Sequence, residues 1–169
     1  RILIGSGARP FVPDIPGKEY SITSDEALDL MSRPERISIV GAGYIAVEFA
    51  GIFAELGSEV TLLVRSELLR GFDRDVANEL EAALERSGIK LVYGGEVSSI
   101  KKQDGNYLLE TSEGRNIETD LVMFAAGRVP NIEGMGLENI DVELKSGGAI
   151  QVDEFSQTSV ANIYAIGDV

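Results

Sequence analysis

Three residues with phosphate-binding chemistry, Arg65, Ser66 and Arg70, lie close together directly behind an apolar run. A guanidinium group binds phosphate oxygens in a fork, and a serine hydroxyl donates a further hydrogen bond. Two surface arginines can equally be solvated residues with no ligand. The choice between these alternatives depends on what the neighbouring elements could hold.

A glycine-rich loop precedes this cluster, with the pattern Gly41-x-Gly43-x-x-Ala46. It separates an expected strand over residues 36–40 from an amphipathic helical pattern over residues 45–56. In that setting the first glycine allows a tight turn, the second lets a pyrophosphate approach the backbone, and the alanine lets the helix pack on the sheet. A plain strand-to-helix turn is the alternative. The pattern favours a dinucleotide held at the helix N-terminus.

The end of the expected strand over residues 60–64, which follows the glycine loop and its helix, discriminates between the two nicotinamide cofactors. In the NAD form of this fold, an acidic residue there accepts a hydrogen bond from the ribose 2′-hydroxyl. Here the position holds Val64, and Arg65 follows it. We therefore expect NADPH rather than NADH, with Arg65, Ser66 and Arg70 around its 2′-phosphate.

The elements around these residues alternate between strand and helix. Strands are expected over 2–7, 36–40, 60–64, 89–93, 121–126 and 162–166, and helices over 23–31, 45–56 and 73–87. Two turn signals within residues 97–117 indicate an antiparallel meander. The fold class we predict is α/β: a Rossmann-like open parallel sheet with a three-stranded antiparallel meander, with helices on one face and the meander on the other.

Composition excludes several other functions. The net charge is −13, so nucleic acid and anionic membranes are unexpected partners. There is no cysteine and no histidine, so a thiol nucleophile, an imidazole base and a zinc site of the Cys/His type are all absent. We identify no candidate metal ligands. No apolar run approaches the roughly 18 residues of a membrane span. The chain opens on an apolar run without Met, which suggests a fragment or a processed product.

Several ordered segments resemble the flavoprotein disulfide reductases of the glutathione reductase type. They are residues 39–51, 69–73, 126–131, 152–159 and 163–169, and the resemblance covers nearly the whole chain. It implies three segments: 1–23 as a crossover strand and linker from an FAD domain, 24–150 as the NADPH-binding domain, and 151–169 as the return strand. The two terminal strands are expected side by side.

The resemblance also implies roles for single residues. Along the pyrophosphate and ribose of NADPH it places Gly41, Ala42, Gly43 and Ile45. Tyr44 would cover the nicotinamide pocket, and Glu48 would lie near the carboxamide. Gly127 and Arg128 would line the far side of the cofactor, and Asp168 would form a hydrogen bond with FAD. Tyr44 as a core aromatic, Glu48 as a solvated carboxylate and Asp168 in an ordinary turn are the alternatives.

In such a parent enzyme, NADPH reduces FAD, FAD reduces a protein disulfide, and the dithiol reduces glutathione disulfide. The family's cysteine pair, FAD glycine loop and interface domain lie outside these residues, so we expect this chain to bind NADPH without catalysing a reaction alone. The expected partners are the FAD and interface domains of a homodimeric parent in redox homeostasis. We expect a cytoplasmic location, with a plastid or another organelle left open.

Two features leave alternatives to a glutathione reductase. Arg65 and Arg70 are five positions apart, as in high-molecular-weight thioredoxin reductases, whereas typical glutathione reductases place them six apart. A dihydrolipoamide dehydrogenase relative, which uses NAD, is a second alternative, against which Val64 and Arg65 argue. An excised or engineered stand-alone nucleotide-binding module is a third.

Overall fold

The computed structural model describes all residues from Arg1 to Val169. The chain forms two compact units: residues 10–127, and residues 1–9 together with 128–169. We describe each unit separately. None of the helices combines the length and the apolar character needed to cross a lipid bilayer.

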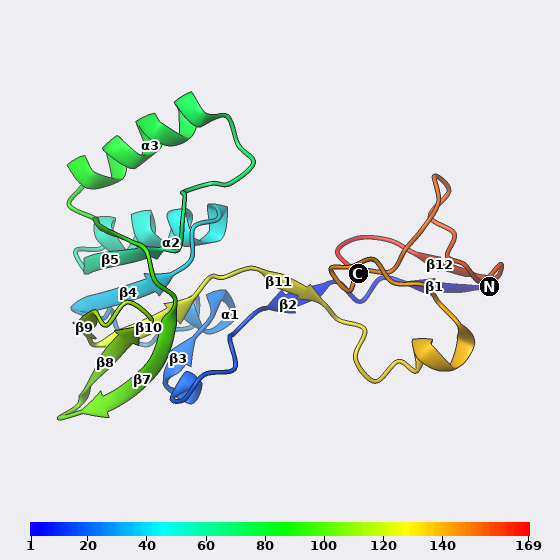
Figure 1. The fold of residues 1–169 in the computed structure, drawn as a ribbon, viewed down its shortest axis with the longest axis horizontal. Helices are drawn as coiled ribbons and strands as arrows, with labels where there is room; N and C mark the ends of the chain where they lie inside the picture. Colours follow the sequence, from blue (N-terminus) through cyan, green and yellow to red (C-terminus); the bar gives the residue numbers. More distant parts are fainter. The chain divides into compact units, whose positions relative to one another are not determined.

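The larger unit is built on a five-stranded parallel sheet with the order β3-β10-β4-β5-β6 (Figure 1). Its strands are β3 (Ser21–Ile22), β4 (Arg36–Val40), β5 (Glu59–Val64), β6 (Lys90–Tyr93) and β10 (Leu121–Phe124). The predicted parallel sheet is confirmed. The strand β3 was not expected, because two residues are too few to give a periodic pattern.

Three helices connect these strands, α1 (Ser24–Ala27), α2 (Tyr44–Glu55) and α3 (Arg74–Arg86). Thr23 caps α1 in the expected capping box, in which Glu26 accepts from the Thr23 backbone N–H at 2.8 Å. That helix ends at Ala27 rather than at the expected Met31, with Leu28 as its C-cap. The residues from Leu28 to the one before Pro34 are non-helical, and a residue that precedes proline disfavours helical backbone. A 3₁₀ turn (Lys18–Tyr20) precedes β3.

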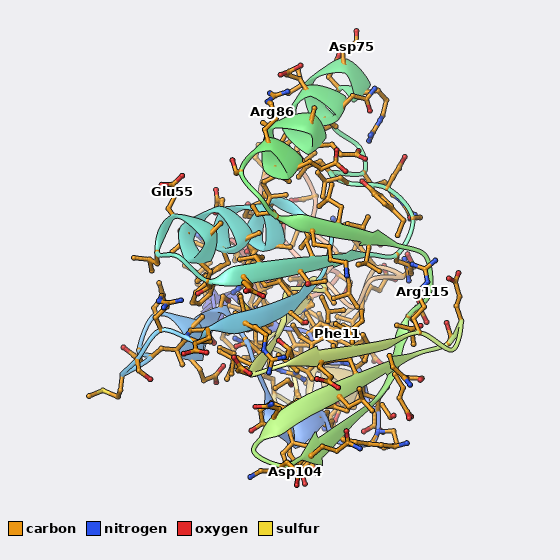
Figure 2. All side chains as sticks on the ribbon, turned by 90° about the vertical axis from the view of Figure 1, so that its left-hand side faces the viewer. Phe11, Glu55, Asp75, Arg86, Asp104 and Arg115 are labelled. Atoms are coloured by element: carbon orange, nitrogen blue, oxygen red, sulfur yellow. The ribbon has the colours of Figure 1, made fainter.

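The expected meander is also present, as β7 (Val97–Gln103), β8 (Asn106–Thr111) and β9 (Asn116–Thr119). Figure 2 shows α2 and α3 on one side of the parallel sheet and the meander on the other. Alternation along β4 and β10 explains this layering. Ile37, Ile39 and Met123 pack in the helix-side core, while Val122 and Phe124 pack in the meander-side core.

The smaller unit contains the terminal strands β1 (Ile2–Ile4) and β12 (Ile163–Ala165), which lie side by side as predicted and pair in parallel. A second pair of strands is β11 (Arg128–Pro130) with β2 (Ala8–Pro10). All of β11 belongs to this unit, together with Ala8 and Arg9 of β2. A 3₁₀ turn (Leu137–Ile140) completes it. Its core consists of Leu137, Val142, Ile150, Ile163, Ala165 and Val169. These units divide the chain differently from the expected segments 1–23, 24–150 and 151–169, whose assignment to cofactor domains stays a prediction.

Candidate functional site

The glycine loop lies at the carboxyl end of β4, next to the end of β10. The Gly41 N–H donates to the Leu63 carbonyl at 3.0 Å, and the Ala125 N–H donates to the Val40 carbonyl at 2.8 Å. A Cβ on Gly41 would lie 2.2 Å from the Ala125 carbonyl oxygen. Only glycine therefore fits this position, because the two loops cross in direct backbone contact.

Gly43 differs from Gly41, because its surroundings are open. No other group lies within 4 Å of the place that a Cβ would occupy. Gly43 is the N-cap of α2 and offers no side-chain cap, and the first turn of the helix carries no acidic residue. The first amide to bond back into the helix is that of Val47, which reaches the Gly43 carbonyl at 3.2 Å. The preceding amides stay available to an anion.

The other long helix of this unit shows the opposite arrangement at its N-terminus. The Asp73 carboxylate accepts from the amides of Asp75 at 2.9 Å and Val76 at 3.2 Å. This N-terminus is satisfied and negatively charged, so it does not favour an anion. Between α2 and α3, only α2 is suited to hold a phosphate.

The loop between β5 and α3 carries the arginine cluster. Arg70 donates from Nη2 to the Ser66 hydroxyl at 2.7 Å, so these two predicted residues lie in contact. The Leu69 N–H donates to the Ala42 carbonyl at 2.7 Å and thereby ties this loop to the glycine loop. Leu69 is buried and has a φ of 49°. A non-glycine residue in this left-handed region is held there by its surroundings.

Arg65 follows β5 directly and is about two-thirds exposed. Its Nη1 forms an ion pair with the Glu96 carboxylate at 2.9 Å, from the loop between β6 and β7. Arg70 pairs with Glu67 at 3.4 Å. Sequence reasoning missed both carboxylates. The position of Glu67 between the arginines was a usable signal, but nothing in the sequence places Glu96 beside Arg65.

Tyr44 and Glu48 are one helical turn apart at the start of α2, and both are exposed. This excludes the alternative in which Tyr44 is a core aromatic, because its exposed fraction is 55%. Ile45 is half-buried beside it and contacts the helix-side core. Gly127 has a φ of 123° and open space at its Cβ position, and its carbonyl accepts from the Phe11 N–H at 2.9 Å.

Arg128 and Asp168 belong to the smaller unit, where they line the same open pocket of about 380 Å³ together with Gly167 and Lys145. Arg128 donates to the Ala8 carbonyl. The predicted site residues therefore fall into two sets. The larger unit holds Gly41, Ala42, Gly43, Tyr44, Ile45, Glu48, Arg65, Ser66, Arg70 and Gly127, and the smaller unit holds Arg128 and Asp168.

The larger unit is an α/β fold in which a glycine loop leads from the carboxyl end of a parallel strand into a helix, an arrangement that dinucleotide-binding folds share. The family model for pyridine nucleotide-disulphide oxidoreductases matches residues 1–169. The chain belongs to this family.

Two curated relatives are glutathione reductases. The one from Burkholderia cepacia is 49% identical over 99% of this chain and 38% of its own length. The chloroplastic/mitochondrial one from Pisum sativum is 48% identical over 99% of this chain and 31% of its own length. The chain thus spans about a third of the length of these relatives.

Two solved structures extend the comparison. The Cu(II) complex of an HOCl-induced flavoprotein disulfide reductase from Escherichia coli matches with a TM-score of 0.91, 33% identity, and coverage of 99% of this chain and 38% of that one. An engineered water-forming NADPH oxidase, bound to NADPH, matches with a TM-score of 0.88, 31% identity, and coverage of 98% and 38%. That oxidase carries engineered neighbouring arginine and serine residues and a second arginine six positions after the first.

Proposed function

We propose that this chain is the NADPH-binding part of an FAD-containing disulfide reductase, and that the larger unit binds NADPH at the carboxyl edge of its sheet. The main support is the position of Arg65, Ser66 and Arg70 next to the glycine loop. The hydrogen bond from Leu69 to Ala42 joins the two loops, and the glycine loop has free backbone amides that can bind an anion. When bound, NADPH supplies a hydride to the flavin of the parent. The chain itself binds and orients the nicotinamide cofactor.

The residues present fit this cofactor. Gly43 and the open N-terminus of α2 leave room and amide donors for the pyrophosphate. Arg65 and Arg70 provide the positive charge for a 2′-phosphate. Val64 stands where the NAD form of this fold has a carboxylate, which would repel that phosphate. The engineered NADPH oxidase supports this assignment, since an arginine, a neighbouring serine and a later arginine were placed in a protein that is bound to NADPH.

The remaining roles extend the same proposal. Tyr44 covers the nicotinamide and moves aside when the cofactor enters, which its exposure on α2 permits. Glu48 accepts from the carboxamide, and Gly127 and Arg128 line the far side of the cofactor. Residues 24–150 serve NADPH, while residues 1–23 and 151–169 connect to an FAD domain that Asp168 contacts.

For the parent we propose NADPH-dependent reduction of glutathione disulfide by a homodimer in the cytoplasm or an organelle. The two glutathione reductase relatives support this substrate. The five-residue spacing of the arginines keeps a thioredoxin reductase relative as the second candidate. The chain lacks cysteine and histidine, so we propose that it binds NADPH but carries out no disulfide reduction alone.

Calorimetric titration with NADPH, NADH and FAD tests the proposal. Each hydrogen bond to a charged group contributes roughly 1.5–3 kcal/mol, so Arg65→Ala should weaken NADPH binding by about 10- to 150-fold and leave NADH binding nearly unchanged. Arg86→Ala is the matched control. Arg86 is an equally exposed arginine, paired with Glu79 at 2.8 Å at the far end of α3 (Figure 2). Equal losses of both cofactors in Arg65→Ala would contradict the assignment.

A further inference from the structure

Both arginines proposed for the 2′-phosphate already face a carboxylate. Arg65 lies 2.9 Å from Glu96, and Arg70 lies 3.4 Å from Glu67. The two carboxylates reach the arginines from different loops, Glu96 before β7 and Glu67 after β5. A carboxylate beside an anion site repels the anion, so these pairs need an explanation other than phosphate binding.

We propose that Glu96, with Glu67, is a specificity-determining counter-ion that a phosphate monoester must displace from the arginines. This rests on the proposed NADPH site. Without the monoester, Glu96 holds the Arg65 guanidinium in an ion pair. When the monoester binds, the guanidinium exchanges one carboxylate for a group with a charge of about −1.5 to −2.

The exposure of the pair makes this exchange feasible. The side chains of Arg65 and Glu96 are 65% and 66% exposed, so water solvates the carboxylate once it is released. A fully buried pair would leave an uncompensated charge behind. The Arg65 and Glu96 pair is therefore weak enough to open and still orients the arginine.

The same exchange discriminates between the two cofactors. A ribose 2′-hydroxyl carries no charge and cannot replace Glu96, so NADH binds with the ion pair closed. NADPH binds with the ion pair open, and its affinity contains the cost of opening. Replacing Glu96 with glutamine removes this cost for NADPH alone.

Arg74 keeps Glu67 in place on the second arginine. It donates from Nη1 to the Leu68 carbonyl at 2.9 Å and lies 3.8 Å from the Glu67 carboxylate. Glu67 therefore keeps a cationic neighbour after Arg70 has turned to the phosphate. The cost of displacing Glu67 is smaller than that for Glu96, because Glu96 forms its ion pair with Arg65 alone.

Calorimetry on the 169-residue chain with NADPH and NADH tests the exchange. An exposed ion pair of this kind changes an equilibrium by about 1.5- to 5-fold. We expect Glu96→Gln to bind NADPH about 2- to 5-fold more tightly than the unsubstituted chain, with NADH unchanged, and Glu67→Gln to show a smaller gain. Glu79→Gln is the matched control, since it also removes one negative charge from a pair with an arginine, at 2.8 Å.

A double-mutant cycle isolates the path through Arg65. In the Arg65→Ala background, the gain from Glu96→Gln should fall to that of Glu79→Gln. Weaker or unchanged NADPH binding by Glu96→Gln would overturn the exchange, as would an equal gain from Glu79→Gln or a gain that persists without Arg65.

These failures differ from failure of the proposed function. If the unsubstituted chain prefers NADPH and Arg65→Ala abolishes that preference while Glu96→Gln has no effect, only the exchange is wrong. If the unsubstituted chain does not prefer NADPH over NADH, both proposals are wrong.

Discussion

Two arginine–carboxylate pairs occupy opposite edges of the five-stranded sheet. The amino-edge pair lies where the parallel strands begin: Arg36 is the first residue of β4, and Asp120 directly precedes β10. The carboxyl-edge pair, Arg65 and Glu96, lies beyond the ends of β5 and β6. At the amino edge, Asp120 accepts from Arg36 Nη2 at 2.6 Å, from Nε at 3.1 Å and from the Arg36 backbone amide at 2.9 Å. At the carboxyl edge, one contact of 2.9 Å joins two exposed side chains.

The difference separates a structural ion pair from an exchangeable one. The Asp120 side chain is only 26% exposed, and its three hydrogen bonds fix the ends of two neighbouring strands. The Arg36 guanidinium holds the pKa of the Asp120 carboxyl below its usual value. Such a pair stabilises the fold, whereas a single exposed contact leaves the carboxyl-edge arginine available to a ligand.

The largest effect on stability is expected at the amino edge. Asp120→Asn keeps the shape but loses the charge, and charged hydrogen bonds with partial exposure contribute about 1–2 kcal/mol. The midpoint of thermal unfolding should fall by about 2–8 °C, while Glu96→Gln, the same change at the carboxyl edge, should leave it unchanged. Circular dichroism measures both. Equal shifts would mean that the two pairs do not differ in the way the geometry indicates.

Acidification should weaken the amino-edge pair. The folded-state pKa of Asp120 is lowered, so its stabilisation is fully present above the unfolded-state value of about 3.9. It is lost as the pH falls through the lower folded-state value. The stability difference between the unsubstituted chain and Asp120→Asn should therefore be constant near neutral pH and shrink below about pH 4. Urea unfolding across this range measures it, and a difference that grows on acidification would contradict the assignment.

The sequence predicted the parts of this comparison unequally. The glycine loop and the two arginines follow from local spacing, because strand, turn and helix are set by neighbouring residues. The partners of the arginines do not. Asp120 is 84 positions from Arg36 and Glu96 is 31 positions from Arg65, and no local pattern encodes such pairings. The two-residue strand β3 was missed for a related reason, since only its pairing with β10 defines it.

The smallest effect on stability is expected at Tyr93, the last residue of β6, at the carboxyl end of the sheet. Its hydroxyl is buried and has no hydrogen-bond partner. Burial raises the pKa of Tyr93, and the neighbouring Glu81 carboxylate raises this pKa further. The Glu81 carboxylate does not form a hydrogen bond with the hydroxyl. The amino edge satisfies its polar groups, whereas this hydroxyl is left unpaired, at a cost in stability.

Tyr93→Phe should therefore leave stability unchanged or increase it by up to about 1 kcal/mol, because it removes an unpaired polar atom and keeps the ring. Urea unfolding measures the change. Alkaline titration of tyrosinate absorbance provides an independent check, since a component that titrates above the ordinary tyrosine range should vanish in the variant. A clear destabilisation would show that the hydroxyl has a partner in solution. The contrast between a fully paired amino edge and an incompletely paired carboxyl edge would then be wrong at this residue, while the contrast in exposure between the two ion pairs would stand.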